Sequence, residues 1–446
     1  MRYGLQDRPV LGITLLAALQ WLFVTLSSTI VVPLVIGDVY GLDASETAKL
    51  MQQTIFYAGL ASLLQVLWGH RYPMMDGPAG LWWGIFVILA QIGQSIGQDA
   101  RMIGQSFQTG LMLAGLLFFI LGMFRLIERI QLWFTPIVTG TYMTLLAVSL
   151  CSAFIKGMLG IGFQQSETVQ PEVAIASVLI MILVLVFTRI RQVASFAVLL
   201  GIIVGWVGYG MLGWAEPVRA SDEAIVLPGL LFWGPPAWNG GVLLTSLLTS
   251  FVLLTNLITS IAVVGKAAKE EPTGRQYNRG GVFTGVSHVI SGASGVVGMI
   301  PLSLAAAVIE TTKMAARRPF ILAMLAMMAI GILPSVSQFL ASVPSPVAYA
   351  AMFVTYTQLL GFGLKDFTKV EMDERNITVI GSSLLIGIGV MFVPSAAWQG
   401  LHPLLSYLLG NGLLLGVLVS LLLEHIILPR RSKRKDGPGR NKLEAS

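Results

Sequence analysis

The segment Gly280–Lys313, GGVFTGVSHVISGASGVVGMIPLSLAAAVIETTK, is longer than one membrane crossing, yet glycines and a proline interrupt it. The interruptions are Gly280, Gly281, Gly285, Gly292, Gly295, Gly298 and Pro301. In hydrocarbon every backbone N–H and C=O group needs a partner, so non-helical chain at membrane depth persists only where protein covers it or where it lines a cavity. Tyr72–Phe86, YPMMDGPAGLWWGIF, is interrupted in the same way. Two such segments at corresponding places in two halves indicate a binding site.

The composition is that of a polytopic membrane protein. Of the 446 residues, 55% are hydrophobic and 11% are charged, whereas an average soluble domain has about 25% charged residues. The first apolar run, Val10–Ile36, is too long for the core of a cleaved signal peptide and is expected to be the first span. Cys151 is the single cysteine, which excludes an internal disulfide and indicates no metal site.

The net charge of +6 comes from basic residues in short loops and in the C-terminal sequence PRRSKRKDGPGRNK. This distribution indicates membrane topology and contact with anionic lipid; nucleic acid is not an expected partner. We expect residues 1–430 to form a single membrane-embedded unit and residues 431–446 to form a disordered basic cytoplasmic tail.

Fourteen segments are candidate spans, given that a helix needs roughly 20 apolar residues to cross the bilayer. They lie near 10–36, 46–68, 72–92, 107–124, 133–153, 172–188, 194–214, 241–264, 280–298, 299–315, 319–341, 344–362, 376–393 and 403–428. With a cytoplasmic N-terminus, 24 of the 28 Lys and Arg residues fall on the cytoplasmic side. The exceptions are Lys49, Arg101, Lys156 and Arg219. This bias predicts an even number of spans and two cytoplasmic termini.

Seven candidate spans precede Leu230 and seven follow it, which predicts two halves of opposite topology. The third span of each half is the interrupted one, and the first carries small polar residues. Helix packing accounts for most of these, because small and hydroxyl side chains let membrane helices approach. Asn256 is set apart, since its amide needs several partners. The small polar residues are Gln20, Thr25, Ser27, Ser28, Thr29, Thr245, Ser246, Thr249, Ser250, Thr255, Asn256, Thr259 and Ser260.

Each interrupted segment contains a proline, Pro78 or Pro301, at which a half-helix is expected to begin, because proline is favoured at the first helical position. The N–H groups that follow are predicted to be free and to point, with the positive ends of two helix dipoles, into the protein. Such a place suits an anion or the carbonyl oxygens of a heterocycle. The predicted free N–H groups belong to Ala79, Gly80, Leu302 and Ser303.

Asp76 and the neighbouring tryptophans each have two interpretations. Asp76 is either an N-cap that accepts a hydrogen bond at a helix start or an intramembrane carboxylate that binds substrate or a proton. Trp82 and Trp83 are either an aromatic platform for a planar ligand or anchors at the membrane boundary.

Two further titratable residues are candidates for proton transfer. His288 lies in the second interrupted segment beside Ser287, where hydrogen-bonded packing is the alternative role. Glu310 lies within helical reach of Lys313, so an ion pair near the interface is the alternative there.

Enzyme signatures are missing from the sequence, which has no HExxH, GxSxG, Cys/His cluster or Walker A loop. The protein is therefore not expected to be an enzyme, to hold a metal or cofactor, or to use ATP directly. Any transport would be driven by a gradient.

Several segments resemble the nucleobase–cation symporter-2 family, the xanthine/uracil permeases. They are QWLFVTLSSTIVVPLVIG, HRYPMMDGPAGLWWG, FTPIVTGTYMTLL with FIKGMLG, GVSHVISGASGVVG and the terminal Thr312-Lys313 of the tenth span. The second and third of these resemble most a divergent bacterial branch of purine permeases. The resemblance implies an all-α membrane fold of 14 spans in two inverted seven-span repeats, with short strands in the broken spans 3 and 10 that meet at the substrate.

The resemblance also implies a core from residues 10–124 and 241–341, a gate from residues 133–214 and 344–428, and homodimers in the bacterial inner membrane. The chain departs from the family pattern where a glutamate usually grips the base, because Asn256 stands there. Leu304-Ala305-Ala306-Ala307 replaces the family's second carboxylate with its Asn and Gly, and Trp21 replaces a histidine. Asn256 can still hydrogen-bond to a base, but it cannot titrate.

These observations predict a secondary transporter that carries a purine by alternating access, coupled to protons. Its predicted substrate-binding residues are Ala79, Gly80, Leu81, Trp82, Asn256, Ser303 and Leu304, and its candidate proton-coupling residues are Asp76, His288 and Glu310. One alternative is an anion transporter of the same fold, which loss of the family carboxylates favours. The other is a membrane sensor that transports nothing and whose basic tail recruits partners.

Overall fold

The computed structural model describes residues 2–95, 97–127, 133, 135–190, 193–215, 223–398, 405 and 409–429. The predicted tail at 431–446 and the basic residues Arg129, Arg191 and Arg219 lie outside these residues.

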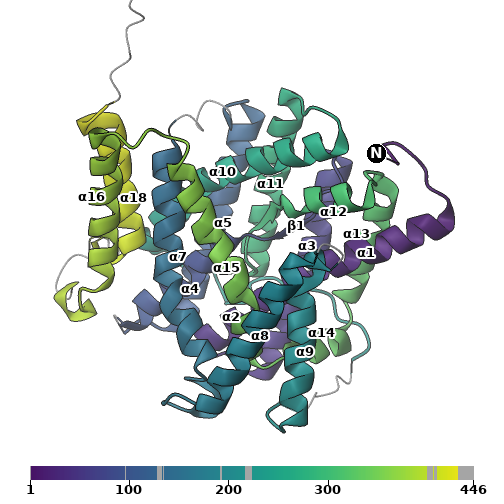
Figure 1. Cartoon of the computed structure of the whole chain (residues 1–446), viewed down its shortest axis with the longest axis horizontal. Helices are drawn as coiled ribbons and strands as arrows, with labels where there is room; N and C mark the ends of the chain where they lie inside the picture. Colours follow the sequence, from purple (N-terminus) through teal and green to yellow (C-terminus); the bar gives the residue numbers. More distant parts are fainter. Residues whose placement is uncertain are drawn as a thin grey trace, which may run out of the picture.

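The described chain is built of helices and one pair of three-residue strands (Figure 1). In the first half the elements are α1 (Leu11–Thr29), α2 (Val31–Tyr40), α3 (Ala44–Leu67), β1 (Asp76–Pro78), α4 (Gly80–Ser95), α5 (Ala100–Met123), α7 (Pro136–Met158), η1 (Phe163–Gln165), α8 (Pro171–Arg189), η2 (Ala194–Phe196) and α9 (Ala197–Met211). In the second half they are α10 (Gly240–Ala268), α11 (Gly274–Ser294), β2 (Met299–Pro301), α12 (Leu304–Thr312), α13 (Arg317–Ile330), α14 (Pro334–Ala341), α15 (Ser345–Phe367), α16 (Glu374–Met391), η3 (Ser395–Trp398), α18 (Gly412–Leu422) and the π-helix η4 (Leu423–Ile427).

Polar side chains at several helix starts explain where the apolar runs become helical. Asp43 and Glu46 form a reciprocal capping box at the start of α3. The Asn239 side chain accepts hydrogen bonds from the first N–H groups of α10, and Thr135 caps α7 just before Pro136. Each cap satisfies N–H groups that have no partner within their helix.

Six of the described helices are long and apolar enough to cross a membrane, and a seventh crossing results if the bent pair α13 and α14, which meet at 85°, is one span. Shorter apolar helices lie within α4, α9 and α15 and across α18 and η4. By length and composition, the described helices therefore support a multi-pass membrane protein, with fewer long spans than the 14 segments of the sequence prediction.

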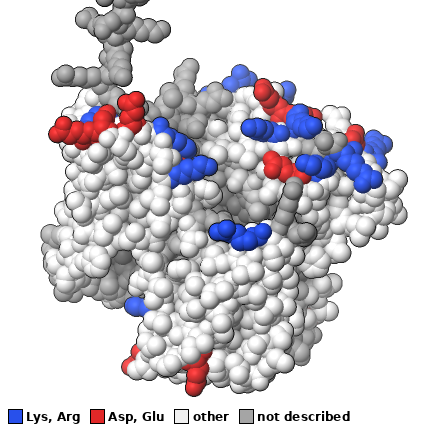
Figure 2. All heavy atoms as spheres, viewed as in Figure 1, with Lys and Arg blue, Asp and Glu red and all other residues white. Residues whose placement is uncertain are grey.

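The surface is divided into charged edges and a broad, largely uncharged belt (Figure 2). Lys and Arg gather along the upper edge of this view together with acidic residues, and acidic residues lie at the lower edge. In α8, Ile175, Leu179, Ile182 and Val186 follow one helical face and are 48–63% exposed. Such a face on the belt is suited to lipid.

The helices pack in two groups. One group contains α1, α3, α5 and α10 to α14, in which α11 packs against α5 and α13 packs against α3 and α1. The other contains α7, α8, α9, α15, α16 and α18, in which α15 packs against α7 and α8. The strand pair packs against α1, α3, α10 and α11 of the first group, and α4 lies where the two groups meet, because it contacts α5 and α10 on one side and α7 on the other.

Close backbone contact holds α5 and α11 together. A Cβ at Gly285 would lie 2.5 Å from the backbone nitrogen of Phe119 and 2.6 Å from the carbonyl oxygen of Gly115. A Cβ at Gly292 would lie 2.8 Å from the carbonyl oxygen of Gln108. Small residues let membrane helices approach this closely, so the glycines of the second interrupted segment serve packing as well as the break.

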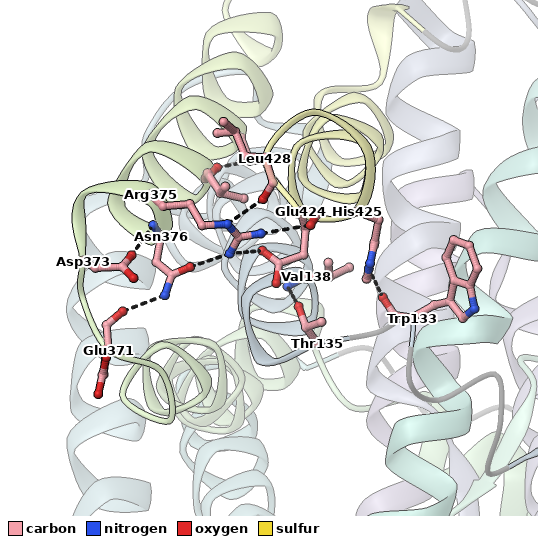
Figure 3. A network of polar contacts seen from close by, with 12 residues as sticks. Trp133, Thr135, Val138, Glu371, Asp373, Arg375, Asn376, Glu424, His425 and Leu428 are labelled. Atoms are coloured by element: carbon pink, nitrogen blue, oxygen red, sulfur yellow. Dashed lines mark hydrogen bonds and ion pairs between the residues drawn. The ribbon is translucent and has the colours of Figure 1, made fainter. Parts of the chain in front are cut away.

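A buried polar network joins the start of α16 to the end of α18 and η4 (Figure 3). Arg375 Nη1 lies 3.2 Å from Glu424 Oε2, and their side chains are 19% and 2% exposed. Arg375 also donates to the carbonyl oxygens of Leu428 (2.5 Å) and Glu424 (2.9 Å), which η4 leaves without helical partners. His425 contacts the carbonyl oxygen of Trp133 at 2.8 Å, close to the start of α7.

We expect Arg375→Met to lower the free energy of unfolding by about 3 kcal/mol, because it leaves the buried Glu424 carboxylate without its partner. Arg375→Met combined with Glu424→Leu should recover most of the loss. Lys369→Met is the control, since Lys369 pairs with Asp366 at an exposed position and such pairs contribute about 0–1 kcal/mol. Thermal unfolding of the purified proteins in detergent measures all three. Equal thermal unfolding midpoints for Arg375→Met and Lys369→Met would contradict the claim that the network stabilises the fold.

Candidate functional site

The centre of the molecule is the antiparallel pair of β1 and β2, in which Gly77 lies opposite Ile300. All six strand residues are buried. The strands lie within the two interrupted segments, and a Cβ at Gly77 would meet the Leu302 side chain at 2.8 Å. Each strand leads directly into a short helix, so the N-termini of α4 and α12 meet at the strand pair.

The prolines lie differently from the sequence prediction. Pro78 and Pro301 are the last residues of the strands, and the helices begin later, at Gly80 and Leu304. A two-stranded pair tolerates proline because each strand has an open edge where no N–H is needed.

Two of the four N–H groups predicted to be free donate hydrogen bonds across the β1–β2 pair. Ala79 donates to the carbonyl oxygen of Gly298 at 3.0 Å, and Leu302 donates to that of Met75 at 2.9 Å. The prediction was wrong for these two because it treated the chain after each proline as helix, whereas the strand ladder extends by one residue.

The other two N–H groups remain available at the helix ends. Gly80 and Ser303 are exposed, and their N–H groups donate to no other residue that the structure describes. Both groups lie at the positive ends of helix dipoles. Behind them, Ala79 is fully buried and Leu81 is 2% exposed, so these two shape the site through their backbone.

Asp76 lies in β1 and is not an N-cap. Its N–H donates to the Ser62 hydroxyl at 2.7 Å, which ties the strand to α3. The residue is fully buried, and neither carboxyl oxygen accepts a hydrogen bond from the described residues. The Gln65 amide nitrogen donates instead to the Gly280 carbonyl oxygen at 3.0 Å and to the Thr284 hydroxyl at 2.9 Å. The N-cap interpretation is therefore wrong, and a role of this carboxylate in binding substrate or a proton stays a prediction.

Trp82 and His288 form a closed pair inside the first helix group. The Trp82 indole N–H donates to His288 Nε2 at 2.6 Å, and His288 Nδ1 lies 2.8 Å from the carbonyl oxygen of Thr284. Because an indole can only donate, His288 is neutral with its proton on Nδ1, and both ring nitrogens are occupied. Trp82 is fully buried against Phe107, so its ring is no exposed platform.

Trp83 points the other way, toward the second helix group. Its ring lies 5.1 Å from that of Tyr356 on α15 and 5.8 Å from that of Phe154 on α7. Its Nε1 would lie 3.9 Å from a Cβ at Gly80, so the indole flanks the N-terminus of α4. The Trp83 side chain is also buried, at 2% exposed, so a platform role for either tryptophan stays a prediction, and Trp83 is the one that borders the start of α4.

Asn256 lies partly buried on α10, which packs against α12, β2 and α4. Its Oδ1 accepts a hydrogen bond from Ser260 at 3.0 Å, so the amide is held from one side by its own helix. The Thr255 hydroxyl beside it is buried without a partner among the described residues.

One face of α12 is exposed. It carries Ser303, Leu304, Ala307, Glu310 and Thr311, and Leu304 is 38% exposed. Glu310 makes none of the ion pairs found among the described residues, because Lys313 ends the helix in a left-handed conformation with φ 57°.

Polar groups on the facing helices were not singled out as site residues from the sequence. The Tyr142 hydroxyl of α7 donates to Thr249 on α10 at 3.3 Å, across the two groups. The Tyr356 hydroxyl is buried without a partner among the described residues, and a Cβ at Gly84 would lie 3.2 Å from it. Tyr142 and Tyr356 each lie in an apolar helix, and a tyrosine in such a helix gives no sequence signal for a site.

Comparison with known proteins identifies relatives along nearly the whole chain. A family model of the xanthine/uracil permeases, described as "Permease family", matches residues 12–396. The chain is 36% identical to "Putative purine permease YwdJ" of Bacillus subtilis over 94% of this chain and 97% of that protein. It is 24% identical to "Uric acid permease PucK" of the same species, with 95% and 97% covered.

Among solved structures, the transmembrane domain of the cyanobacterial bicarbonate transporter BicA is similar, with a TM-score of 0.60 and 16% identity. The match covers 94% of this chain and 98% of that one. At this identity the likeness shows a shared fold, that of a multi-pass membrane transporter.

Proposed function

Because this chain belongs to the xanthine/uracil permease family, we propose that it is a secondary transporter that carries a nucleobase, specifically a purine, across the membrane. The relatives are named for purines, xanthine and uric acid, which supports this class of solute. The protein is then a permease and not an enzyme.

The observation that carries the proposal is the pair of helix ends at Gly80 and Ser303. Both offer an N–H group with no other described partner, and both lie at positive dipole ends. The Trp83 indole flanks one of them. Two separated donors beside the Nε1 edge of an indole suit a flat ring that carries carbonyl oxygens.

The two N–H donors also predict which bases are preferred as substrates. Xanthine, hypoxanthine and guanine each carry a carbonyl oxygen that an N–H group can meet, whereas adenine has none. The Asn256 amide can donate to and accept from a base edge at once, in place of the family's glutamate. We expect oxygen-bearing purines to be preferred over adenine. Leu304 then borders the ring as an apolar neighbour, whereas Leu81 supports the site through its backbone.

We propose Asp76 as the proton-coupling residue. Its carboxyl group has no hydrogen-bonded partner among the described residues, so it can gain and lose a proton without breaking a contact. His288 would have to release the Trp82 indole to accept a proton on Nε2, and Glu310 is exposed on α12. Both are weaker candidates on these grounds.

The proposed mechanism is alternating access of the elevator type, in a protein of 14 spans that form two inverted seven-span repeats. The core, residues 10–124 and 241–341, would move against the gate, residues 133–214 and 344–428. The separate packing of the two helix groups supports such a division. Cytoplasmic termini, contact with anionic lipid and homodimers complete the proposal.

We expect Trp83→Ala to raise the KM for a transported purine about tenfold, because base stacking on an aromatic side chain contributes about 1–3 kcal/mol. Trp83→Phe keeps an aromatic face and should remain within about threefold of the wild type. Initial uptake rates at several substrate concentrations give both values. An unchanged KM in Trp83→Ala would remove this residue from the site.

Uptake into proteoliposomes tests the proposed function. Labelled xanthine, hypoxanthine, guanine, adenine, uracil and urate are offered under an inward proton gradient. Accumulation of at least one purine is expected, with loss in Asn256→Ala.

The second candidate function is transport of an inorganic or organic anion. The fold shared with a bicarbonate transporter and the two positive helix ends favour it. Competition by sulfate, bicarbonate or a carboxylate, with no effect of any base, would establish this function and overturn the first.

A further inference from the structure

A hydrogen bond connects α2, which packs on α3 of the first helix group, to α15 of the second group. The Tyr349 hydroxyl of α15 donates to Asp38 Oδ2 of α2 at 2.7 Å. A hydrogen bond to a carboxylate is among the stronger ones in proteins.

Asp38 is held rigidly on its side of the contact. A Cβ at the preceding Gly37 would lie 2.6 Å from Thr47 Oγ1, so α2 packs directly on α3. The Tyr40 hydroxyl donates to the carbonyl oxygen of Phe86 at 2.9 Å, which ties α2 to α4. The carboxylate therefore moves with α3 and α4.

Tyr349 is held equally firmly on the other side. Its side chain is 2% exposed, and a Cβ at Gly157 of α7 would lie 2.1 Å from Tyr349 Cδ2. The Phe154 ring, also on α7, lies 5.8 Å away at a nearly perpendicular angle. The hydroxyl therefore moves with α7 and α15.

The contact lies on the opposite side of the strand pair from the N-terminus. In Figure 1, α2 lies below β1, whereas the N-terminus lies above it. The end of α12 is on the upper side, because the Arg2 N–H donates to the carbonyl oxygen of Lys313 at 2.7 Å. The exposed face of α12 and the hydrogen bond thus belong to opposite sides of the site.

We propose that Asp38 and Tyr349 form a latch that closes the lower side of the site and holds the protein open on the side of α12. The inference rests on the proposed movement of one helix group against the other, since that movement separates the two residues. Breaking the hydrogen bond then favours the state that is open on the lower side.

Cysteine labelling of the purified protein in nanodiscs tests the latch without any substrate. In a Cys151→Ala background, Ala307→Cys reports access on the exposed face of α12. Thr245→Cys reports on a buried crevice between the groups, which Ile85, Tyr142 and Leu413 also line. With Tyr349→Phe, the rate of maleimide labelling at position 307 should fall and the rate at position 245 should rise, each by about tenfold. This factor is the change in the equilibrium between the two states that the loss of one hydrogen bond to a charged group produces.

Tyr40→Phe is the matched control, because it removes a buried tyrosine hydrogen bond between α2 and α4 but leaves the Asp38–Tyr349 bond and the direct packing of α2 on α3 in place. It should leave both rates unchanged. Asp38→Asn keeps an acceptor and should give a smaller shift in the same directions. Unchanged rates in Tyr349→Phe, equal shifts in Tyr40→Phe, or a rise at both positions, as partial unfolding would give, would each overturn the latch. Failure of purine uptake would leave these outcomes unaffected.

Discussion

Asp76→Asn is expected to abolish proton-driven accumulation of substrate while leaving exchange of substrate across the membrane. The carboxyl group is buried in β1 and has no hydrogen-bonded partner among the described residues, which is the ground on which we propose it as the proton carrier. Asparagine is nearly the same size and keeps the N–H that bonds to Ser62. With one proton carried per substrate, an inward gradient of about one pH unit supports about tenfold accumulation in the wild type. Asp76→Asn should bring this ratio to about one.

The measurement compares net uptake under a proton gradient with exchange in vesicles preloaded with unlabelled substrate. Glu310→Gln is the control, because it removes an exposed carboxylate on α12 and should keep accumulation near the wild-type value. If Asp76→Asn still accumulates substrate in response to the gradient, the proton is carried elsewhere.

Gly285→Leu is expected to leave at most about a tenth of the protein folded. The new side chain would enter a backbone contact in which even a Cβ lies 2.5 Å from Phe119 N. Backbone cannot move aside as a flexible side chain can, so the cost exceeds the roughly 1–3 kcal/mol that is typical of overpacking. α5 and α11 would then separate, and β2 would lose the support of α11, against which it packs.

Size-exclusion chromatography of the detergent-solubilised protein measures the folded, monodisperse fraction. Gly381→Leu on α16 is the matched control, since a Cβ there meets nothing within 4 Å. Gly285→Ala should give an intermediate loss. A monodisperse Gly285→Leu protein in wild-type amounts would show that α5 and α11 do not pack as closely as described.

The sequence was sufficient to find the interrupted segments, because glycine and proline mark non-helical chain in an apolar context. It did not place the helix starts. Pro78 and Pro301 read as helix starts by local preference, but pairing between segments more than 200 residues apart makes them strand ends. Long-range pairing also occupies the N–H groups of Ala79 and Leu302.

The two tryptophans show a second limit. Adjacent helical residues point about 100° apart, so Trp82 and Trp83 face different partners. Which of them packs against α5 and which against α7 and α15 depends on how α4 is rotated about its axis, and no local sequence pattern determines that rotation. The His288 partner is likewise 206 positions away. Glu310 and Lys313 have helical spacing, yet the helix ends at Lys313, so the predicted ion pair is not formed.

The central claim is that a purine binds between the N-termini of α4 and α12, and substrate protection tests it most directly. In a Cys151→Ala background, Ser303→Cys places a thiol at the start of α12, and Thr168→Cys places one at an exposed position after η1. Saturating xanthine should slow alkylation at position 303 at least about fivefold and leave position 168 unchanged, because a bound ligand excludes the reagent. Equal alkylation rates at position 303 with and without every purine tested would contradict the account, and protection by sulfate or bicarbonate instead would assign the site to an anion.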